Sequence, residues 1–320
     1  MKYNKKKFFF IFLIILIDLY FYNKYYFCLK CIKNYKKFNE CEQCPTHIVF
    51  NGLKIFSDKE TLNQIIKYKK SISRFGDGEF RLILWKNIRF QKSNKILSNK
   101  LFEVLNSNDK DFLIGINIPY RILNKLTNHE IKFWTKYFKR YRFKIINLLN
   151  IKKKYYSATI TRFYYRYKDK SNASNFIKQL KKIWENKNIL IIEGDKSRIG
   201  IGNDLFNNAK SIKRIICPSQ NAFKVYDKII KQVTKLGENR LILVALGPTA
   251  SILTYDLYKL GYQSIDFGHL DIEYEWFLRN TTKKLQIENK YVNEAEGINH
   301  NFTKVKDKNY YKQIIAYILN

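Results

Sequence analysis

The sequence predicts an α/β protein with a mostly parallel sheet and flanking helices. Short continuous apolar runs, such as ILIIE at 189–193 and LILVAL at 241–246, are typical of strands buried on both faces of a parallel sheet. Longer amphipathic stretches separate these runs, and such alternation is typical of α/β layers. Apolar residues make up 46% of the chain, which excludes wholesale disorder.

Each expected element follows from its local pattern. Short apolar runs predict strands, and apolar positions at helical spacing predict helices. The expected strands cover residues 71–75, 112–116, 157–163, 189–193, 214–217, 241–246 and 264–267. The expected helices cover residues 58–69, 94–106, 128–149, 175–185, 220–236 and 249–260, with a terminal helix over 310–319.

The chain is strongly basic, with 60 Lys and Arg against 27 Asp and Glu and a net charge of +33. Such a balance favours anionic partners, namely phosphate-bearing substrates, acidic lipids or nucleic acid. The basic residues are scattered, however, so we attribute most of the excess to compositional drift. Neither zinc-finger histidine pairs nor an RNP-like aromatic strand is present, so a nucleic-acid partner is not expected.

Residues 1–27 have the pattern of a retained signal anchor. Four lysines lie within residues 2–7, and an apolar run over 8–17 follows without a small-residue cleavage site. The run is short for a membrane span, and Asp18 interrupts it, so a buried or surface-lying helix is the alternative. We expect a single-pass or membrane-associated protein that meets the membrane surface. Lysines flank both ends, so charge does not set the orientation.

Two CxxC pairs lie in the following segment, residues 28–51. Cys28 and Cys31 form the first pair, and Cys41 and Cys44 form the second. Paired thiolates at this spacing can close a tetrahedral site around a structural Zn²⁺. Disulfides in an oxidising compartment and unliganded thiols are the alternatives. The fifth cysteine, Cys217, lies in an apolar run and is expected in the core.

An acidic triplet follows the first expected strand, within RFGDGEF at 74–80. Gly76 frees the backbone for a tight turn, and Asp77 and Glu79 can both reach a hard divalent cation. Such a cation would offset the charge of a departing diphosphate, and Arg74 could add a bidentate phosphate contact. The alternative is an acidic turn that only caps the next helix.

A second polar motif, EGDKSR at 193–198, also follows an apolar strand. Its glycine, together with Lys196 and Arg198, could cradle phosphate through amides and cations. The GK[ST] element of a P-loop is absent. A solvated charged loop is the alternative.

A third motif, LGPTA at 246–250, follows LILVA. Pro248 suits the first turn of a helix, and Gly247 permits close approach of the backbone. The amides at this helix start, near Thr249, would favour an anion. An ordinary strand-to-helix turn is the alternative.

A fourth motif, GHLDIEYEWF at 268–277, combines a histidine with three acids. His269 could bind the cation or orient a donor, and Asp271 or Glu273 could act as base toward an acceptor hydroxyl. The alternative is an amphipathic helix with a hydrogen-bonded histidine.

Taken in order, these motifs resemble the GT-D-type glycosyltransferases found in bacterial protein and polysaccharide glycosylation clusters. The resemblance lies in RFGDGEF, EGDKSRIGIGNDLF, CPSQNAF and LGPTASILTYDLYKLGYQSIDFGHLDIEYEWF. It covers residues 52–280, which we interpret as the glycosyltransferase domain. Residues 1–27 and 28–51 lie outside it, as does the C-terminal tail, 281–320.

The resemblance implies a Rossmann-like fold, a nucleotide-sugar donor and a divalent cation, Mn²⁺ or Mg²⁺, at Asp77 and Glu79. The acceptor would be a glycan, glycoprotein or glycolipid. The donor-site role carries over to Arg74, Gly76, Lys196, Arg198, Gly247, Thr249 and His269.

Two other functions are compatible with parts of the pattern. A dinucleotide-dependent oxidoreductase would need a GxGxxG turn, and GIGND at 200–204 lacks the third glycine. A non-catalytic, membrane-anchored binding module with a zinc knuckle would turn over no nucleotide sugar.

Overall fold

The computed structural model describes residues 50, 52–237, 239–292, 294–295 and 302–319. The predicted N-terminal anchor and the four cysteines of the predicted zinc site lie outside this range. Among the helices of the described residues, none combines the length and apolarity that crossing a bilayer requires.

The core is one nine-stranded sheet in which every pairing is parallel, in the order β1-β4-β3-β2-β8-β7-β5-β6-β9. This confirms the predicted α/β class with a parallel sheet. The strands are β1 Lys54–Ile55, β2 Ser71–Phe75, β3 Phe112–Ile116, β4 Lys154–Ser157, β5 Asn188–Gly194, β6 Ser211–Cys217, β7 Leu241–Ala245, β8 Ser264–Asp266 and β9 Ile314–Tyr317.

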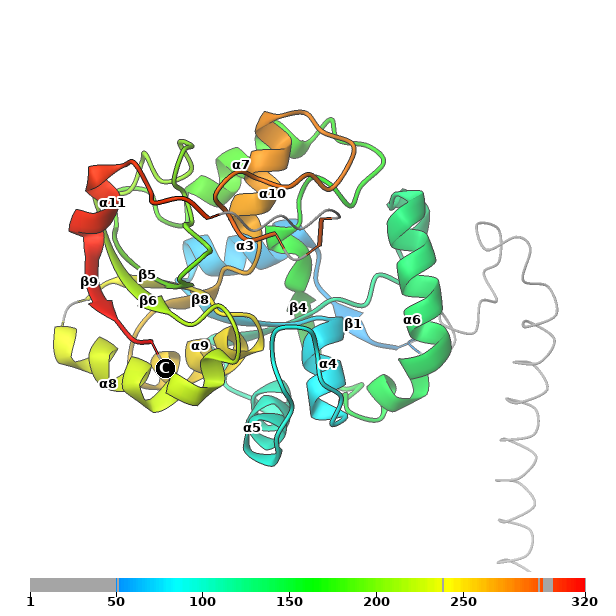
Figure 1. Ribbon diagram of the computed structural model, residues 1–320. Coiled ribbons are helices and arrows are strands. Elements are labelled where there is room, and N and C mark those ends of the chain that lie inside the picture. Colours follow the sequence, from blue (N-terminus) through cyan, green and yellow to red (C-terminus); the bar gives the residue numbers. More distant parts are fainter. Residues whose placement is uncertain (1–49, 51, 238, 293, 296–301, 320) are drawn as a thin grey trace, which may run out of the picture.

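Helices cover both faces of the sheet, and Figure 1 shows α3, α7 and α10 on one side with α5, α8 and α9 on the other. Alternate residues of the strands supply the two cores: in β7, Ile242 and Val244 belong to one apolar cluster, and Leu241 and Leu243 to the other. The helices are α3 Asp58–Lys67, α4 Asp77–Ile83, α5 Lys95–Asn106, α6 Asn128–Ile146, α7 Ala173–Lys181, α8 Tyr226–Leu236, α9 Pro248–Lys259, α10 Leu270–Leu278 and α11 Lys308–Gln313.

The strand predicted over 157–163 is wrong in most of its length. Strand β4 ends at Ser157, and a 3-10 helix over Ala158–Thr161 follows. The Ser157 hydroxyl accepts a hydrogen bond from the Thr159 amide at 3.1 Å, and Thr159 donates to Asp58 at 2.9 Å. Because the Ser157 side chain binds the backbone amide two residues later, the strand ends at Ser157.

The terminal helix predicted over 310–319 is confirmed as far as Gln313 and is wrong beyond it. Helix α11 ends at Gln313, and the chain continues as strand β9 beside β6. The Ile318 amide donates to the Ile216 carbonyl at 2.7 Å. The β-branched residues of IIAY suit an edge strand, and the open edge of β6 supplies the pairing partner.

The middle of the sheet is where the chain reverses the direction in which it adds strands. Strands β2, β3 and β4 run outward to one edge, β5 and β6 run toward the other, and β7 and β8 fill the space between. In open parallel sheets such a reversal leaves a crevice at the carboxyl ends of the central strands. The residues after β2 and β8 therefore meet at one place.

Candidate active site

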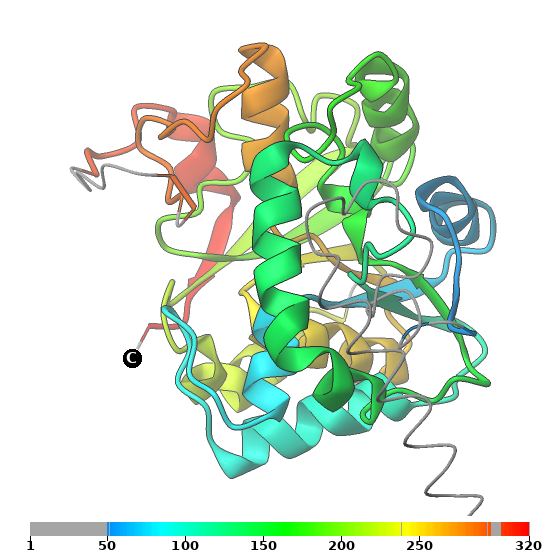
Figure 2. The same cartoon turned by 90° about the vertical axis from the view of Figure 1, so that its right-hand side faces the viewer.

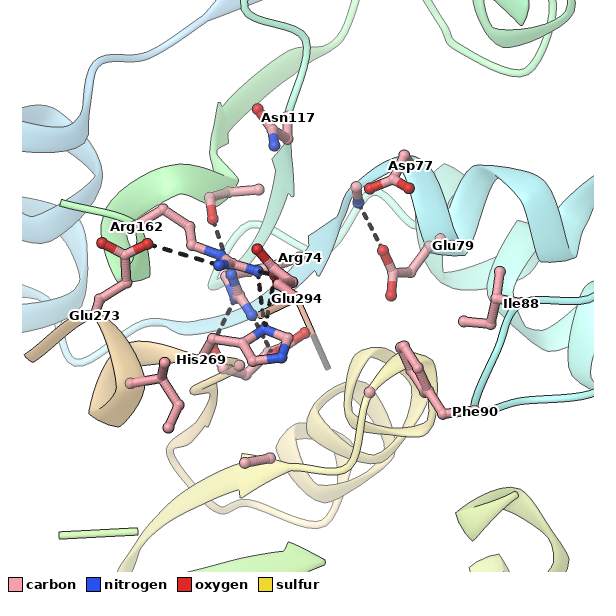
Figure 3. Close-up of a pocket in the computed structure, with 18 of the residues that line it drawn as sticks. Arg74, Asp77, Glu79, Ile88, Phe90, Asn117, Arg162, His269, Glu273 and Glu294 are labelled. Carbon is pink, nitrogen blue, oxygen red and sulfur yellow. Dashed lines mark hydrogen bonds and ion pairs between the residues drawn. The ribbon is translucent and has the colours of Figure 1, made fainter. Parts of the chain in front are cut away.

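A pocket of about 450 Å³ lies at the carboxyl ends of the central strands. Its walls include the start of α4, the first turns of α6, the 3-10 segment after β4 and the start of α10. Figure 3 shows Asp77 and Glu79 together at the start of α4, across the pocket from Arg162 and His269. The predicted acidic triplet and the predicted histidine motif therefore share one cavity.

The two acids of the triplet occupy the first turn of α4. The Glu79 side chain reaches back and accepts a hydrogen bond from the Gly76 amide at 2.7 Å. It thus caps the helix with one carboxylate oxygen and lines the pocket as well. No described side chain donates a hydrogen bond to the Asp77 carboxylate. The capping interpretation and the cation-binding interpretation are therefore compatible for this pair.

Burial raises the pKa of both acids. For Glu79 it lifts the pKa from 4.5 to about 7, although the Gly76 amide opposes the shift. For Asp77, burial and the nearby charge of Glu294 raise the pKa. Carboxylates held in a buried place without a cation are electrostatically unfavourable, and a divalent ion would relieve this.

The other acids of the pocket have cationic partners. Within the described part of the chain, Asp77 and Glu79 form no ion pair, and no cluster of three or more His, Cys, Asp or Glu forms a ready-made metal cage. Two hard oxygen donors fit Mn²⁺ or Mg²⁺, which take further oxygens from water and phosphate. The pairs formed by the remaining pocket acids are Asp266–Arg74, Asp271–Lys290, Glu273–Arg162, Glu294–Arg162 and Glu130–Lys284.

Arg74 lines the pocket and connects β2 to neighbouring elements of the sheet. Its guanidinium donates to the Asp266 carbonyl and carboxylate at 2.8 and 2.9 Å, and to Ala158 and Thr161 at 3.0 and 2.6 Å. Gly268 makes room for it, because a Cβ there would lie 1.8 Å from an Arg74 nitrogen. Four contacts inside the protein make Arg74 a positioning residue for the site.

Arg162 joins three elements on the opposite wall. It contacts His269 Nδ1 at 2.9 Å, lies 3.6 Å from Glu273, and forms a short ion pair with Glu294. Because a guanidinium only donates, Nδ1 of neutral His269 accepts and Nε2 carries the proton. Burial opposes ionisation of Glu294, but the charges of Arg162 and Lys284 outweigh it and hold the pKa of Glu294 well below its usual value.

Arg166 also lines the pocket, and its guanidinium has few hydrogen bonds. The residue is 3% exposed, and its Nε and Nη2 atoms have no hydrogen-bond partner among the described residues. Its Nη1 atom makes a long hydrogen bond to Asn117 at 3.4 Å, and the guanidinium lies 5.6 Å from the centroid of the Tyr167 ring. A buried cation with unused donors that lines a cavity is suited to an anionic ligand.

Comparison with known proteins decides the family. The glycosyltransferase GT-D fold matches residues 72–295. This chain belongs to the GT-D glycosyltransferase family. It is 37% identical over 267 residues to the glycosyltransferase GlyD of Streptococcus pneumoniae serotype 4, an alignment that covers 82% of this chain and 32% of the relative. The probable glycosyl transferase Gly of Streptococcus gordonii is 36% identical over 272 residues, with 82% and 39% covered.

The fold agrees with solved structures of the same family. A structure of the highly conserved domain of unknown function 1792, described as a distinct glycosyltransferase fold, is 37% identical with a TM-score of 0.79 and covers 85% of this chain and 97% of that one. A glycosyltransferase of this domain type from Streptococcus sanguinis is 35% identical, with a TM-score of 0.77 and coverages of 83% and 99%. The chain spans about a third of the length of the two streptococcal relatives, and nearly all of the solved domains.

The GT-D domain does not bring every predicted donor-site residue to the pocket. Lys196 and Arg198 both lie against Phe302, and Arg198 also donates to the Asn289 carbonyl at 3.0 Å. Thr249 is fully buried in α9, outside the pocket wall. Gly247 does line the pocket, with φ at +54° and its Cα against Phe90.

The two acids predicted as bases are held by internal partners in the GT-D domain. Asp271 accepts from the Gly200 amide and Asn203, both at 2.9 Å, and pairs with Lys290 at 2.7 Å. Glu273 accepts from the amides of residues 164 and 165 at 3.2 and 2.9 Å. Sequence reasoning missed Asp266, although it lies in the longest stretch of the resemblance, and it missed Arg162, Arg166 and Glu294, which lie outside the motifs.

Proposed function

We propose that this glycosyltransferase takes its sugar from a nucleoside diphosphate donor and uses a divalent cation held by Asp77 and Glu79. The observation that carries the proposal is the pairing of charges in the pocket. Its other acids form ion pairs with Arg or Lys, and the two acids of the triplet form none with any described residue. When bound, Mn²⁺ or Mg²⁺ supplies Lewis-acid stabilisation of the leaving diphosphate.

Arg166 and Arg162 have different roles in this proposal. Arg166 lines the pocket and has two guanidinium donors without a partner among the described residues, so we assign it the contact with the donor phosphates. Arg162 holds His269 in one tautomer and orientation, and His269 in turn orients the donor. Lys196 and Arg198 stay outside this scheme, because their side chains lie against the C-terminal segment.

Asp271 and Glu273 shape the acceptor side of the pocket. Both carboxylate oxygens of Asp271 are engaged, and Glu273 accepts two backbone amides beside Arg162. Transferring a proton from an acceptor hydroxyl to either acid would break these contacts. We therefore assign them positioning roles rather than the role of base, and the acceptor remains a hydroxyl of a glycan, glycoprotein or glycolipid.

The test is donor hydrolysis and transfer with a panel of nucleotide sugars, with Mn²⁺, with Mg²⁺ and with chelator. We expect activity with a cation only, and a loss of about a thousandfold or more in kcat for Asp77→Asn. Glu79→Gln keeps an oxygen for the Gly76 amide and removes the charge, so it separates capping from cation binding. Asp227→Asn is the matched control, an exposed acid in the first turn of α8.

Two results would contradict the proposal. Full activity of the Asp77→Asn variant would remove the cation from the mechanism. Turnover that persists in chelator, equally in the parent and in the Asp227→Asn variant, would also show that the reaction needs no cation. Isothermal titration of Mn²⁺ in the presence of nucleoside diphosphate gives a readout besides activity, and we expect Asp77→Asn to abolish the binding heat.

A further inference from the structure

Helix α6 carries a basic stripe along its outer side. Lys132, Lys136, Lys139, Arg140 and Phe143 follow helical spacing, so they lie on one face, and all five are exposed. We call this set the α6 stripe. The opposite face is buried against the domain through Trp134, Tyr137, Phe138, Tyr141 and Ile145. Figure 2 shows α6 in front of the sheet, along one side of the molecule.

The α6 stripe is not explained by contacts within the domain. Its four cations form no ion pair with any described residue, and the stripe contains no acid. The single acid of the helix, Glu130, lies at its start in the pocket wall and pairs with Lys284 at 3.8 Å. Phe143 is 51% exposed among these cations. A helix face that combines cations with an exposed aromatic is typical of binding to an anionic lipid surface.

The first described residue of the chain lies beside this helix. The ring of Phe50 packs against that of Phe138 of α6, with centroids 5.4 Å apart. The residues before it include the lysine-rich start and the apolar run over 8–17. A membrane-binding sequence that leads into the domain at α6 would bring that helix close to the lipid surface.

We propose that the α6 stripe docks on a membrane surface rich in anionic lipids. The lysines and Arg140 contact phosphate-bearing headgroups, and Phe143 inserts at the boundary with the acyl chains. The first turns of the same helix supply His129, Glu130, Phe133 and Trp134 to the pocket wall. Docking therefore fixes the pocket at the membrane surface. The proposal is independent of the identity of the sugar and of the cation.

The experiment uses the full chain on vesicles of phosphatidylcholine, with or without phosphatidylglycerol, in which the acyl chains carry bromine. Bromine quenches tryptophan fluorescence at short range, so the Phe143→Trp variant reports contact of α6 with lipid. The control is Tyr317→Trp, an aromatic of similar exposure, 59%, on the edge strand β9. We expect quenching, above that of the unaltered chain, for Phe143→Trp only, and only with phosphatidylglycerol present.

A charge test in the Phe143→Trp background completes the design. Each lysine near an anionic surface strengthens binding about fivefold, so K132Q/K136Q/K139Q should weaken docking about a hundredfold and abolish the quenching. The matched control K228Q/K231Q/K235Q removes three exposed lysines from α8 and should leave the quenching unchanged.

Three results would overturn the proposal. They are equal quenching for Phe143→Trp and Tyr317→Trp, quenching that does not depend on phosphatidylglycerol, and equal losses in the two lysine variants. The last of these would assign any binding to the overall charge of the chain rather than to the α6 stripe.

Discussion

Replacing Gly268 by alanine tests whether the Arg74–Asp266 pair supports the pocket. Gly268 has φ at +50°, where an alanine is strained, and an added Cβ would lie 1.8 Å from an Arg74 nitrogen. The guanidinium must move, and movement breaks its contacts with Asp266, whose carboxylate is almost fully buried. The substitution therefore adds backbone strain and leaves a buried acid without its cation.

The two costs can be separated in magnitude. A non-glycine residue in the left-handed region costs about 1 kcal/mol. Breaking a buried ion pair costs about 3 kcal/mol, so we expect Gly268→Ala to lower the free energy of unfolding by roughly 4 kcal/mol. Gly237→Ala is the matched control, since Gly237 has φ at +58° with nothing within 4 Å of an added Cβ. It should lose only the strain, about 1 kcal/mol.

Urea unfolding followed by circular dichroism measures both variants against the parent. The displaced Arg74 would also enter the pocket, so Gly268→Ala should lose glycosyl transfer even where it is folded, and Gly237→Ala should keep it. Equal, small losses of stability in the two variants would refute the reasoning, because Arg74 would then have an alternative position at little cost.

Three further predictions concern charges in the pocket. Arg166→Gln should raise the donor KM about tenfold to a hundredfold with little change in stability, because two of the donors it removes have no partner among the described residues and the third makes only a long hydrogen bond to Asn117; a loss of stability with unchanged KM would contradict this. Glu79→Gln should become more stable than the metal-free parent by on the order of 2 kcal/mol as pH rises from about 5 to 8. Burial raises the pKa of Glu79 to about 7, so the folded parent loses stability when that acid ionises. Free energies of unfolding that differ by the same amount at every pH in this range would contradict the prediction. Arg162→Gln should lower the free energy of unfolding by about 2 kcal/mol near pH 7. The difference between parent and variant should become smaller as pH falls below the usual pKa of a glutamate, because Arg162 holds the pKa of Glu294 low in the folded parent. A difference that stays the same between neutral and acidic pH would show that the Arg162–Glu294 pair does not cause the loss of stability.

The sheet was predictable because its strands are buried on both faces. A run such as ILIIE leaves no polar face for a helix at the surface, and strands β2 and β3 have the predicted bounds. The C-terminal residues 314–317 were not predictable in the same way. Their strand exists because β6 offers an open edge there, which is a tertiary contact that the local pattern does not contain.

Some residues of the site could be predicted from the local sequence, and others depend on tertiary contacts. The acids of the DGE triplet were predictable, since a strand, a glycine turn and a helix start follow one another in the sequence. Arg162 and Glu294 meet across 132 residues, so neither could be predicted without the fold. Lys196 and Arg198 show the converse, because their motif is well formed but their side chains lie against Phe302.

The charges that the pocket leaves unmatched are the strongest support for the proposed ligand. Asp77 and Glu79 form no ion pair with a described residue, and two donors of Arg166 have no acceptor among the described residues. A nucleoside diphosphate with a divalent cation supplies a partner for each, since the cation meets the two carboxylates and the phosphates meet the guanidinium. A neutral ligand would satisfy neither set, and a diphosphate alone would bring more negative charge toward the two acids. The cation and the donor should therefore bind with positive cooperativity, each with higher affinity when the other is present.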